Sequence, residues 1–247
     1  MFFNFVRPKI VVDAFTDKDN INTVAPITSA AERLPSWWRD LPKQYPHENS
    51  FVQGINHPTI RRCPAVTKVF TNGLVIPLWA DIIIETGADG GIRWQWSDYI
   101  RVSDDDTANG IGHHPVEQYG PNFSDLIHLK LISPWVLKEK TGVDFYFTAP
   151  YWSNTDLMRS SIHICPGIIN YKYTSATHVN MFMPKRDCRT TMRCGDPTVL
   201  LIPMTDKEVI VKTHVISQSE HRAMALRTVF KNSFFNNYSR RVKAENL

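Results

Sequence analysis

Residues 127–151 read IHLKLISPWVLKEKTGVDFYFTAPY, and this stretch decides the fold. Large apolar side chains occupy alternate positions on both sides of a charged segment, residues 138–142, which ends in glycine. A period of two is typical of a β-strand that places one of its faces in a core. A charged, glycine-containing segment between two such runs indicates a chain reversal. We therefore predict a β-hairpin across residues 127–151.

A second hairpin is predicted just before it. Residues 74–85, LVIPLWADIIIE, form the most apolar run of the chain, and residues 87–91, GADGG, have the composition of a tight turn. The return strand would place Ile92, Trp94 and Trp96 on one face. Trp94 and Trp96 would form a sugar-stacking surface if they were exposed, although aromatic residues at strand spacing more often belong to a core.

The remaining sequence up to residue 216 continues in the same style. Short apolar runs between residues 161 and 216 are separated by turns rich in proline, glycine and aspartate, with no helical pattern between them. Such spacing is typical of antiparallel sheets, so we predict a mainly β fold, an antiparallel sandwich or jelly-roll-like domain. The chain has 247 residues, of which 43% are hydrophobic, which suffices for one large core. We expect residues 1–216 to form a single domain.

Short helices are predicted near the N-terminus. Ser29 and Glu32 have capping-box spacing, in which each side chain accepts a hydrogen bond from a free backbone N–H group. A helical turn follows Pro35 and contains Trp37 and Trp38. Two adjacent tryptophans cannot both face one core, so we expect one to cover the sheet and the other to meet a loop or a partner protein. Both are candidate interaction residues.

The segment 217–247 differs from the β-rich body. We predict a C-terminal basic amphipathic helix, which either folds back onto the body or serves as a docking arm for a neighbouring subunit. The last 31 residues contain six Lys or Arg and two Glu, so they carry the whole net charge of +4. A basic segment of this kind suits an acidic partner or a solvated helix face. The candidate interaction residues of this segment are Leu226, Phe230, Phe234, Tyr238, Arg240, Arg241 and Lys243.

The sequence contains no established catalytic motif. P-loop, nucleophile-elbow, zinc-protease and dinucleotide-binding patterns are all absent. His113, His114 and Glu117 are weak metal candidates, because adjacent histidines on an extended chain point to opposite faces. The four cysteines lack zinc-site spacing, and we expect free buried thiols. We predict no catalytic residue, metal ligand or cofactor.

Membrane and nucleic-acid partners are not expected. No apolar run reaches the roughly 20 residues that span a bilayer, and the first residues lack the pattern of a signal peptide. We therefore expect the chain to stay in the cytoplasm of the cell that makes it. The basic segment near the C-terminus is too short to predict a nucleic-acid-binding face.

Several motifs together resemble a protein family encoded by tailed, marine T4-like bacteriophages. They cover about residues 25–215 and read ERLPSWWRDLP, TIRRCP, TNGLVIPLWADI, SPWVLKEKTGVDFYFTAP, CPGIINY and GDPTVLLIPM. The resemblance supplies no catalytic residues. It implies a virus-encoded protein and makes a place in the virion a reasonable expectation.

Three classes of function are compatible with these observations. The first is a structural or assembly component of a phage virion, such as a capsid, neck or tail accessory protein. Its partners would be other phage structural proteins, and we expect a homo-oligomer. The second is a β-sandwich that binds carbohydrate or another small ligand. The third is a metal-dependent jelly-roll enzyme, which would require His113, His114 and Glu117 to gather with another histidine.

Overall fold

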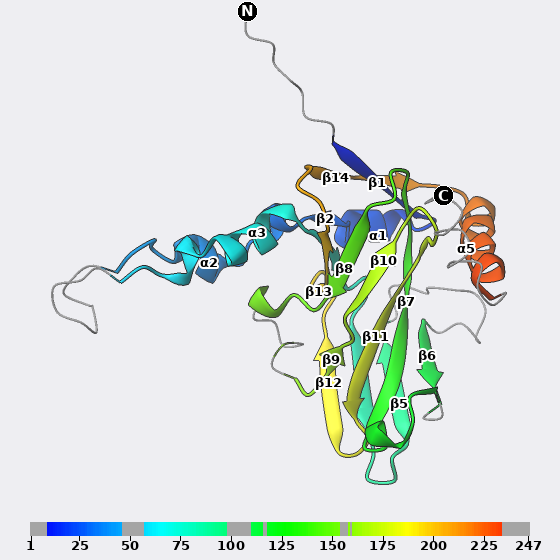
Figure 1. Cartoon of the computed structure of the whole chain (residues 1–247). Helices are drawn as coiled ribbons and strands as arrows, with labels where there is room; N and C mark the ends of the chain where they lie inside the picture. Colours follow the sequence, from blue (N-terminus) through cyan, green and yellow to red (C-terminus); the bar gives the residue numbers. More distant parts are fainter. Residues whose placement is uncertain are drawn as a thin grey trace, which may run out of the picture.

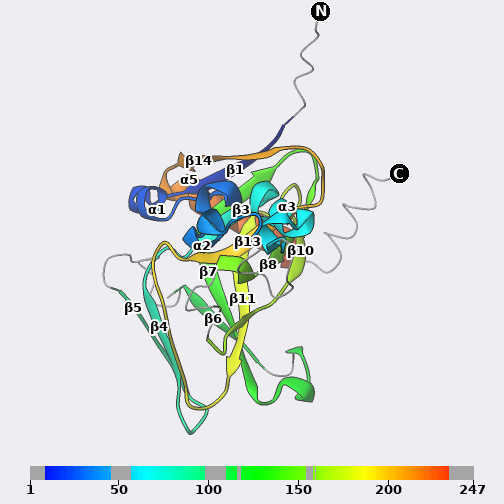
Figure 2. The ribbon, with the colours of Figure 1, turned by 90° about the vertical axis from the view of Figure 1, so that its left-hand side faces the viewer.

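The structure of the chain is a computed structural model, and it is mainly β (Figures 1 and 2). It describes residues 9–45, 57–97, 110–115, 118–153, 158 and 160–233, with side chains up to residue 225. Three sheets account for the strands of this part of the chain.

The largest sheet has six strands. Their order is β14-β1-β7-β11-β9, with β6 also paired to β7. All pairs are antiparallel except β1 with β14, which corrects the prediction of a wholly antiparallel fold. The two parallel strands are almost 200 residues apart, which leaves ample chain for the crossover that parallel pairing needs. The strands are β1 (Ile10–Thr16), β6 (Ile111–His114), β7 (Leu126–Glu139), β9 (His163–Ile164), β11 (Ala176–Pro184) and β14 (Val209–Val215).

Two smaller sheets complete the β structure. The five-stranded sheet has the order β10-β8-β13-β3-β2, and the three-stranded sheet has the order β12-β4-β5. The five strands are β2 (Thr28–Ser29), β3 (Leu74–Pro77), β8 (Asp144–Thr148), β10 (Gly167–Asn170) and β13 (Pro197–Pro203). The other three are β4 (Ile82–Thr86), β5 (Ile92–Trp96) and β12 (Cys188–Met192).

Residues 127–151 form two strands, as predicted, but these strands are not a hairpin. β7 belongs to the six-stranded sheet and β8 to the five-stranded sheet, so the chain passes from one sheet to the other between them. Trp135 and Phe145 are both fully buried in the same core. The period of two places one face of each strand inward, whether the strands pair or face each other, so it does not distinguish the two arrangements.

The turn between β7 and β8 is organised by the buried carboxylate of Glu139. It accepts hydrogen bonds from the backbone N–H groups of Thr141, Gly142 and Val143, at 2.6, 2.7 and 3.1 Å. Gly142 has a φ of 86°, a backbone conformation that residues other than glycine rarely adopt. The buried Asn170 at the end of β10 donates from its amide to the carbonyl of Gly142, at 2.8 Å. The turn is therefore fixed from both sheets.

Inward-facing side chains of all three sheets form one hydrophobic core. It includes Leu131 and Met181 from the six-stranded sheet, Leu201 from the five-stranded sheet and Ile84 from the three-stranded sheet. The hairpin predicted from residues 74–85 and 92–96 is confirmed only from residue 82 onward, where β4 and β5 pair across a tight turn; residues 74–77 form β3 in the five-stranded sheet instead. Because the core is shared, the apolar runs of all three sheets are buried against one another.

Short helices lie against one side of the sheets (Figures 1 and 2). Half of the predicted capping box is present: the amide of Glu32 donates to the hydroxyl of Ser29, but the Glu32 carboxylate accepts from that hydroxyl rather than from a backbone N–H group. It begins a 3-10 helix rather than an α-helix, because Pro35 follows after one turn. The helices up to β3 are α1 (Asp19–Val24), η1 (Ala30–Arg33), α2 (Ser36–Asp40), η3 (Ile60–Arg62) and α3 (Pro64–Asn72).

The C-terminal segment contains a helix, α5 (Gln218–Ser233). Its first turns contact the body, because His221 lies 3.0 Å from the carbonyl oxygen of Pro134 and 3.9 Å from the carboxylate of Asp17. The side chains of Leu226 and Phe230, and all of residues 234–247, lie outside the described part of the chain. The amphipathic character of this segment therefore stays a prediction. No helix of the described residues is long and apolar enough to cross a membrane.

Replacing Glu139 tests the importance of the turn. In Glu139→Gln an amide NH₂ takes the place of one carboxylate oxygen and faces backbone N–H donors. We expect the free energy of unfolding to fall by about 3 kcal/mol, because hydrogen bonds to a buried charged group are lost. Urea unfolding measures this change. Lys140→Gln, at an exposed position of the same turn, should change it by less than about 0.5 kcal/mol. Equal effects of the two substitutions would contradict the role of Glu139.

Candidate functional site

The outer face of the five-stranded sheet is unusually apolar. In an antiparallel sheet with one face on the core, the other face normally carries polar side chains. Here the residues that point outward from neighbouring strands β10, β8 and β13 include Ile168, Tyr146 and Ile202, which are paired in register, with Thr148 and the exposed Asp144 on the same face of β8. Ile168 is 61% exposed and Tyr146 is 40% exposed, and Met204, just after β13, is 60% exposed. We call Ile168, Tyr146, Ile202 and Met204 the apolar face.

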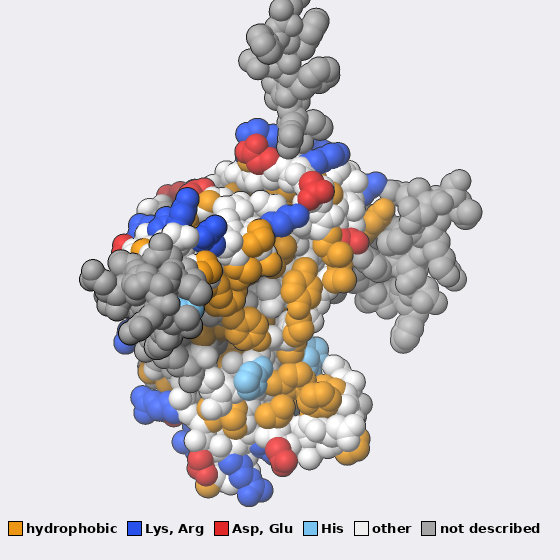
Figure 3. All heavy atoms as spheres, turned by 60° about the vertical axis from the view of Figure 1, so that its left-hand side comes forward, with side chains coloured by type: hydrophobic (Ala, Val, Ile, Leu, Met, Phe, Trp, Pro, Cys, Tyr) orange, Lys and Arg blue, Asp and Glu red, His pale blue; other side chains and the backbone are white. Residues whose placement is uncertain are grey.

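The short helices cover only one end of this outer surface. Ala30 of η1 packs with Val75 of β3 and Leu200 of β13 in a small cluster beside the apolar face. Val69 of α3 and Ile202 pack against the same cluster. The short helices cover the sheet only as far as Ile202. Beyond this residue the row of apolar side chains continues into the exposed part of the sheet. Figure 3 shows hydrophobic side chains gathered in a band across this side of the molecule, with both basic and acidic side chains above it.

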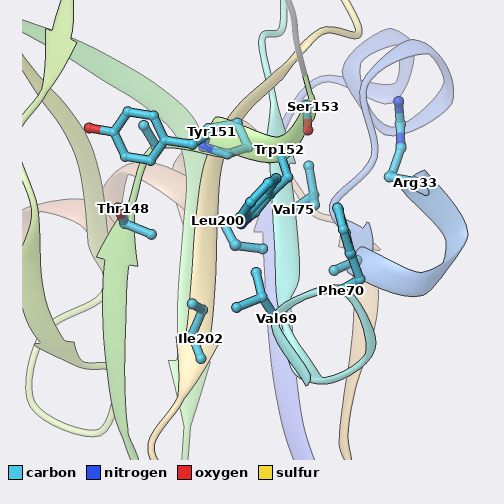
Figure 4. A pocket seen from close by; sticks show the side chains of 13 residues that line it. Arg33, Val69, Phe70, Val75, Thr148, Tyr151, Trp152, Ser153, Leu200 and Ile202 are labelled. Carbon is cyan, nitrogen blue, oxygen red and sulfur yellow. The ribbon is translucent and has the colours of Figure 1, made fainter. Parts of the chain in front are cut away.

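A groove lies where the cover ends. Its volume is about 130 Å³, and its walls come from η1, α3, β3, the end of β8, β13 and the single turn η7 (Tyr151–Ser153). Figure 4 shows Trp152 and Phe70 on either side of Val75, with Leu200, Val69 and Ile202 below them. Tyr151 points away from the groove and is 62% exposed, and Trp152 is 37% exposed. Exposed Tyr and Trp beside an apolar hollow are typical of residues that contribute most to protein contacts.

Trp37 and Trp38 help to position this groove. Trp38 is buried against Phe70 of α3, with ring centres 4.6 Å apart. It therefore packs on a helix, whereas we predicted that one of the two tryptophans would cover the sheet. The reason is that α2 lies against α3, which presents Val66 and Phe70 toward it. Trp37 meets a loop, as predicted: its indole N–H donates to the carbonyl oxygen of Trp152 at 2.9 Å. The turn that carries Tyr151 and Trp152 is thereby fixed to α2.

The other predicted interaction residues are not brought to this groove by the described structure. Leu226 and Phe230 belong to α5, which contacts β7 of the other large sheet. Phe234, Tyr238, Arg240, Arg241 and Lys243 lie outside the described residues. The sequence-based reasoning also missed Arg33, Tyr151 and Trp152. The sequence carried a usable signal only for the apolar face, since FYF in residues 145–147 and LLIPM in residues 200–204 are apolar at successive positions and therefore on both strand faces.

The histidines that were considered as metal ligands lie on a strand, not in an exposed loop as expected. His113 and His114 belong to β6, which pairs with β7. His113 is exposed, whereas His114 stacks on His128 of β7, with ring centres 4.6 Å apart. Glu117 lies outside the described residues. Within the described part of the chain, no three His, Cys, Asp or Glu side chains are grouped so that they could hold a metal ion.

The alternative sugar site loses its main support. Trp94 and Trp96 are half-buried and pack against the core, and Trp96 stacks on the fully buried Trp79 at 6.1 Å. The four cysteines are free, as predicted, although each is half-buried rather than buried. Burial raises the pKa of the Cys165, Cys188 and Cys194 thiols, which keeps them protonated at neutral pH.

Comparison with known proteins adds no identification. No family model matches the sequence, and no curated protein matches it.

The histidines on the six-stranded sheet predict a pH dependence of stability. Burial, with the nearby charges of Lys130 and His114, lowers the pKa of His178 to about 4, and burial and His114 also lower the pKa of His128. The unfolded chain then binds more protons than the folded chain below the ordinary pKa of 6.5. This contribution to stability is present above pH 6.5 and is lost as the pH falls toward 4. We expect His178 alone to account for a loss of about 2 to 3 kcal/mol.

Urea unfolding of the His178→Gln variant between pH 7 and pH 4 measures this contribution. The variant should lose less stability than the unaltered protein over this range, because it lacks the titrating group. His163→Gln, at an exposed position on β9, should follow the unaltered protein. Identical pH profiles for all three proteins would show that His178 is not responsible.

Proposed function

We propose that this protein is a structural or assembly component of a tailed-phage virion, a capsid, neck or tail accessory protein that acts through protein–protein contacts. The observation that carries the proposal is the apolar face with its adjoining groove. A contiguous exposed apolar surface next to fixed aromatic residues is a feature of contact sites rather than of a solvated sheet. The resemblance of the sequence to a phage-encoded family supports the viral setting.

The finer features of the fold are part of this proposal. We infer a β-sandwich in which the six-stranded and five-stranded sheets enclose the shared core, since both contribute inward-facing residues to it. The body would be one domain, with residues 217–247 as a docking arm whose first turns are fixed at His221. Homo-oligomers are the usual form of virion components, and other phage structural proteins would be the partners. The site of action would be the virion, after synthesis in the host cytoplasm.

The groove itself gives a specific reason to keep one alternative. Its volume and apolar lining also suit a small apolar ligand, which would make the protein a ligand-binding β-sandwich. The two functions differ in what the apolar face does. A small ligand would need only the groove, whereas a protein partner would also cover Ile168, which lies on the edge strand beyond it.

Peptide mass spectrometry on gradient-purified particles of the encoding virus tests the proposal. We expect peptides of this protein at a reproducible ratio to the major capsid protein. Particles that lack them, from cells in which the protein is abundant, would contradict the proposal.

Two matched variants then test the apolar face. Ile168→Glu places a charge on the exposed edge of the face, where it should reduce incorporation into particles at least about tenfold, since a buried unpaired carboxylate costs several kcal/mol at an interface. Val24→Glu, at a residue that is 50% exposed on α1, should leave incorporation unchanged. Thermal unfolding should show that both variants fold. Normal incorporation of Ile168→Glu would exclude the apolar face as the contact.

A further inference from the structure

The size of the groove fits one large apolar side chain. Its volume of about 130 Å³ is close to that of cavities that accept a benzene ring, roughly 150 Å³. Its floor consists of Val75, Leu200 and Ile202, and its sides of Val69, Phe70 and Trp152. Such a lining favours an aromatic or branched aliphatic group and offers few partners to a sugar hydroxyl or to ordered water.

One charge lies at the rim of this apolar hollow, and Figure 4 shows its side chain pointing away from the floor at Leu200 and Ile202. Arg33 is the only charged residue among the described residues that line it. Its guanidinium donates to the carbonyl oxygen of Gly195 at 3.1 Å and to the hydroxyl of Thr28 at 3.3 Å. A guanidinium has five N–H donors, so these two bonds leave donors for a further acceptor. No carboxylate of the described residues forms an ion pair with Arg33.

The short helices beside the groove carry a net positive charge. The described residues 30–45 and 57–72, which form the short helices beside it, contain six Lys or Arg and two Asp or Glu. Arg39, Lys43 and Arg62 are exposed there. Lys68, next to Val69 on α3, forms an ion pair with Asp206, and both side chains are largely exposed. A positive field around an apolar hollow attracts a negatively charged partner and repels a positively charged one.

We propose that the groove binds a segment of a partner protein in which one aromatic or branched aliphatic side chain stands beside an aspartate or glutamate. The apolar side chain enters the hollow between Phe70 and Trp152, and the carboxylate accepts hydrogen bonds from Arg33. This inference rests on the proposed function and names the chemistry of the partner. The basic C-terminal segment of a second copy is a poorer occupant, because Arg240, Arg241 and Lys243 would meet the positive field.

The test varies the probe and leaves the protein intact. Nine-residue peptides carry a central Trp in a Gly/Ser background, flanked on both sides by Glu, Gln or Lys. Each peptide is titrated into the full-length protein with labelled methyl groups, and the methyl signals of Val69, Val75, Leu200 and Ile202 report binding at the groove. We expect the Glu-flanked peptide to bind about three- to fivefold more tightly than the Lys-flanked one at about 0.05 M salt. The difference should disappear at about 0.5 M salt, because screening weakens an exposed ion pair.

Variants of the protein separate the two parts of the site. Thr148→Trp fills the groove and should abolish the methyl shifts, whereas Thr191→Trp, at a half-buried strand position outside the groove, should not. Arg33→Lys should keep the preference for Glu, and Arg33→Gln should remove it while the Gln-flanked peptide binds as before. If Arg33→Gln fails to fold, the peptide series alone decides the question.

Three results would overturn the inference. One is the absence of groove shifts with every peptide up to about 5 mM, which corresponds to a binding free energy weaker than about 3 kcal/mol. Another is equal affinity for the three flanking residues at low salt. The last is tighter binding of a peptide with the sequence of residues 230–243, which would identify a second copy as the occupant. Normal particle incorporation alongside any of these results would leave the proposed function standing and remove only the partner chemistry.

Discussion

The buried carboxylate of Glu139 is the interaction on which the arrangement of the sheets depends. Three successive backbone N–H groups converge on it, so the chain can reverse within a few residues without a partner strand. A buried carboxylate is stable only when its hydrogen bonds are made, and an unpaired one would cost several kcal/mol. The turn therefore has one satisfied geometry, which directs β8 into the second sheet. Asn170 of β10 also stabilises this turn, since its amide donates to the carbonyl oxygen of Gly142 and to the carboxylate of Asp144.

The apolar face results from the passage of the chain from the six-stranded sheet to the five-stranded sheet between β7 and β8. Because β8 joins β13 and β10, its outward-facing Tyr146 lies between Ile202 and Ile168, and three apolar side chains form a row across the sheet. The short helices bury only one end of that surface. A hairpin of β7 and β8 would have kept β8 in the six-stranded sheet, and this row would not exist. The same turn that encloses the core thus also creates the exposed apolar face.

Most strands could be predicted from the sequence, but apart from the pairing of β4 with β5 their partners could not. Alternation and turn composition located β7, β8, β4 and β5, because those signals are local. The difference between a hairpin and a crossing depends on whether Glu139 is buried, and burial depends on the rest of the core. The groove was beyond prediction for a related reason, since it combines Arg33, Val69, Trp152 and Leu200, which are far apart in the sequence. His113 and His114 were misplaced in a loop because four strand residues with one apolar side chain give no detectable period.

The groove and its rim are preformed, which lowers the entropic cost of binding a partner. Ordering a side chain at an interface costs about 0.5 to 1.5 kcal/mol, and a flexible rim would subtract that from the binding free energy. Here the indole N–H of Trp37 holds the turn that carries Trp152, and Gly195 and Thr28 hold the guanidinium of Arg33. These anchors come from α2, which packs on α3, from β2 of the five-stranded sheet and from the loop before β13. The apolar hollow and the charge beside it therefore keep a fixed spacing. A fixed spacing lets a short segment be selected by the distance between its apolar side chain and its carboxylate, and not only by its hydrophobicity.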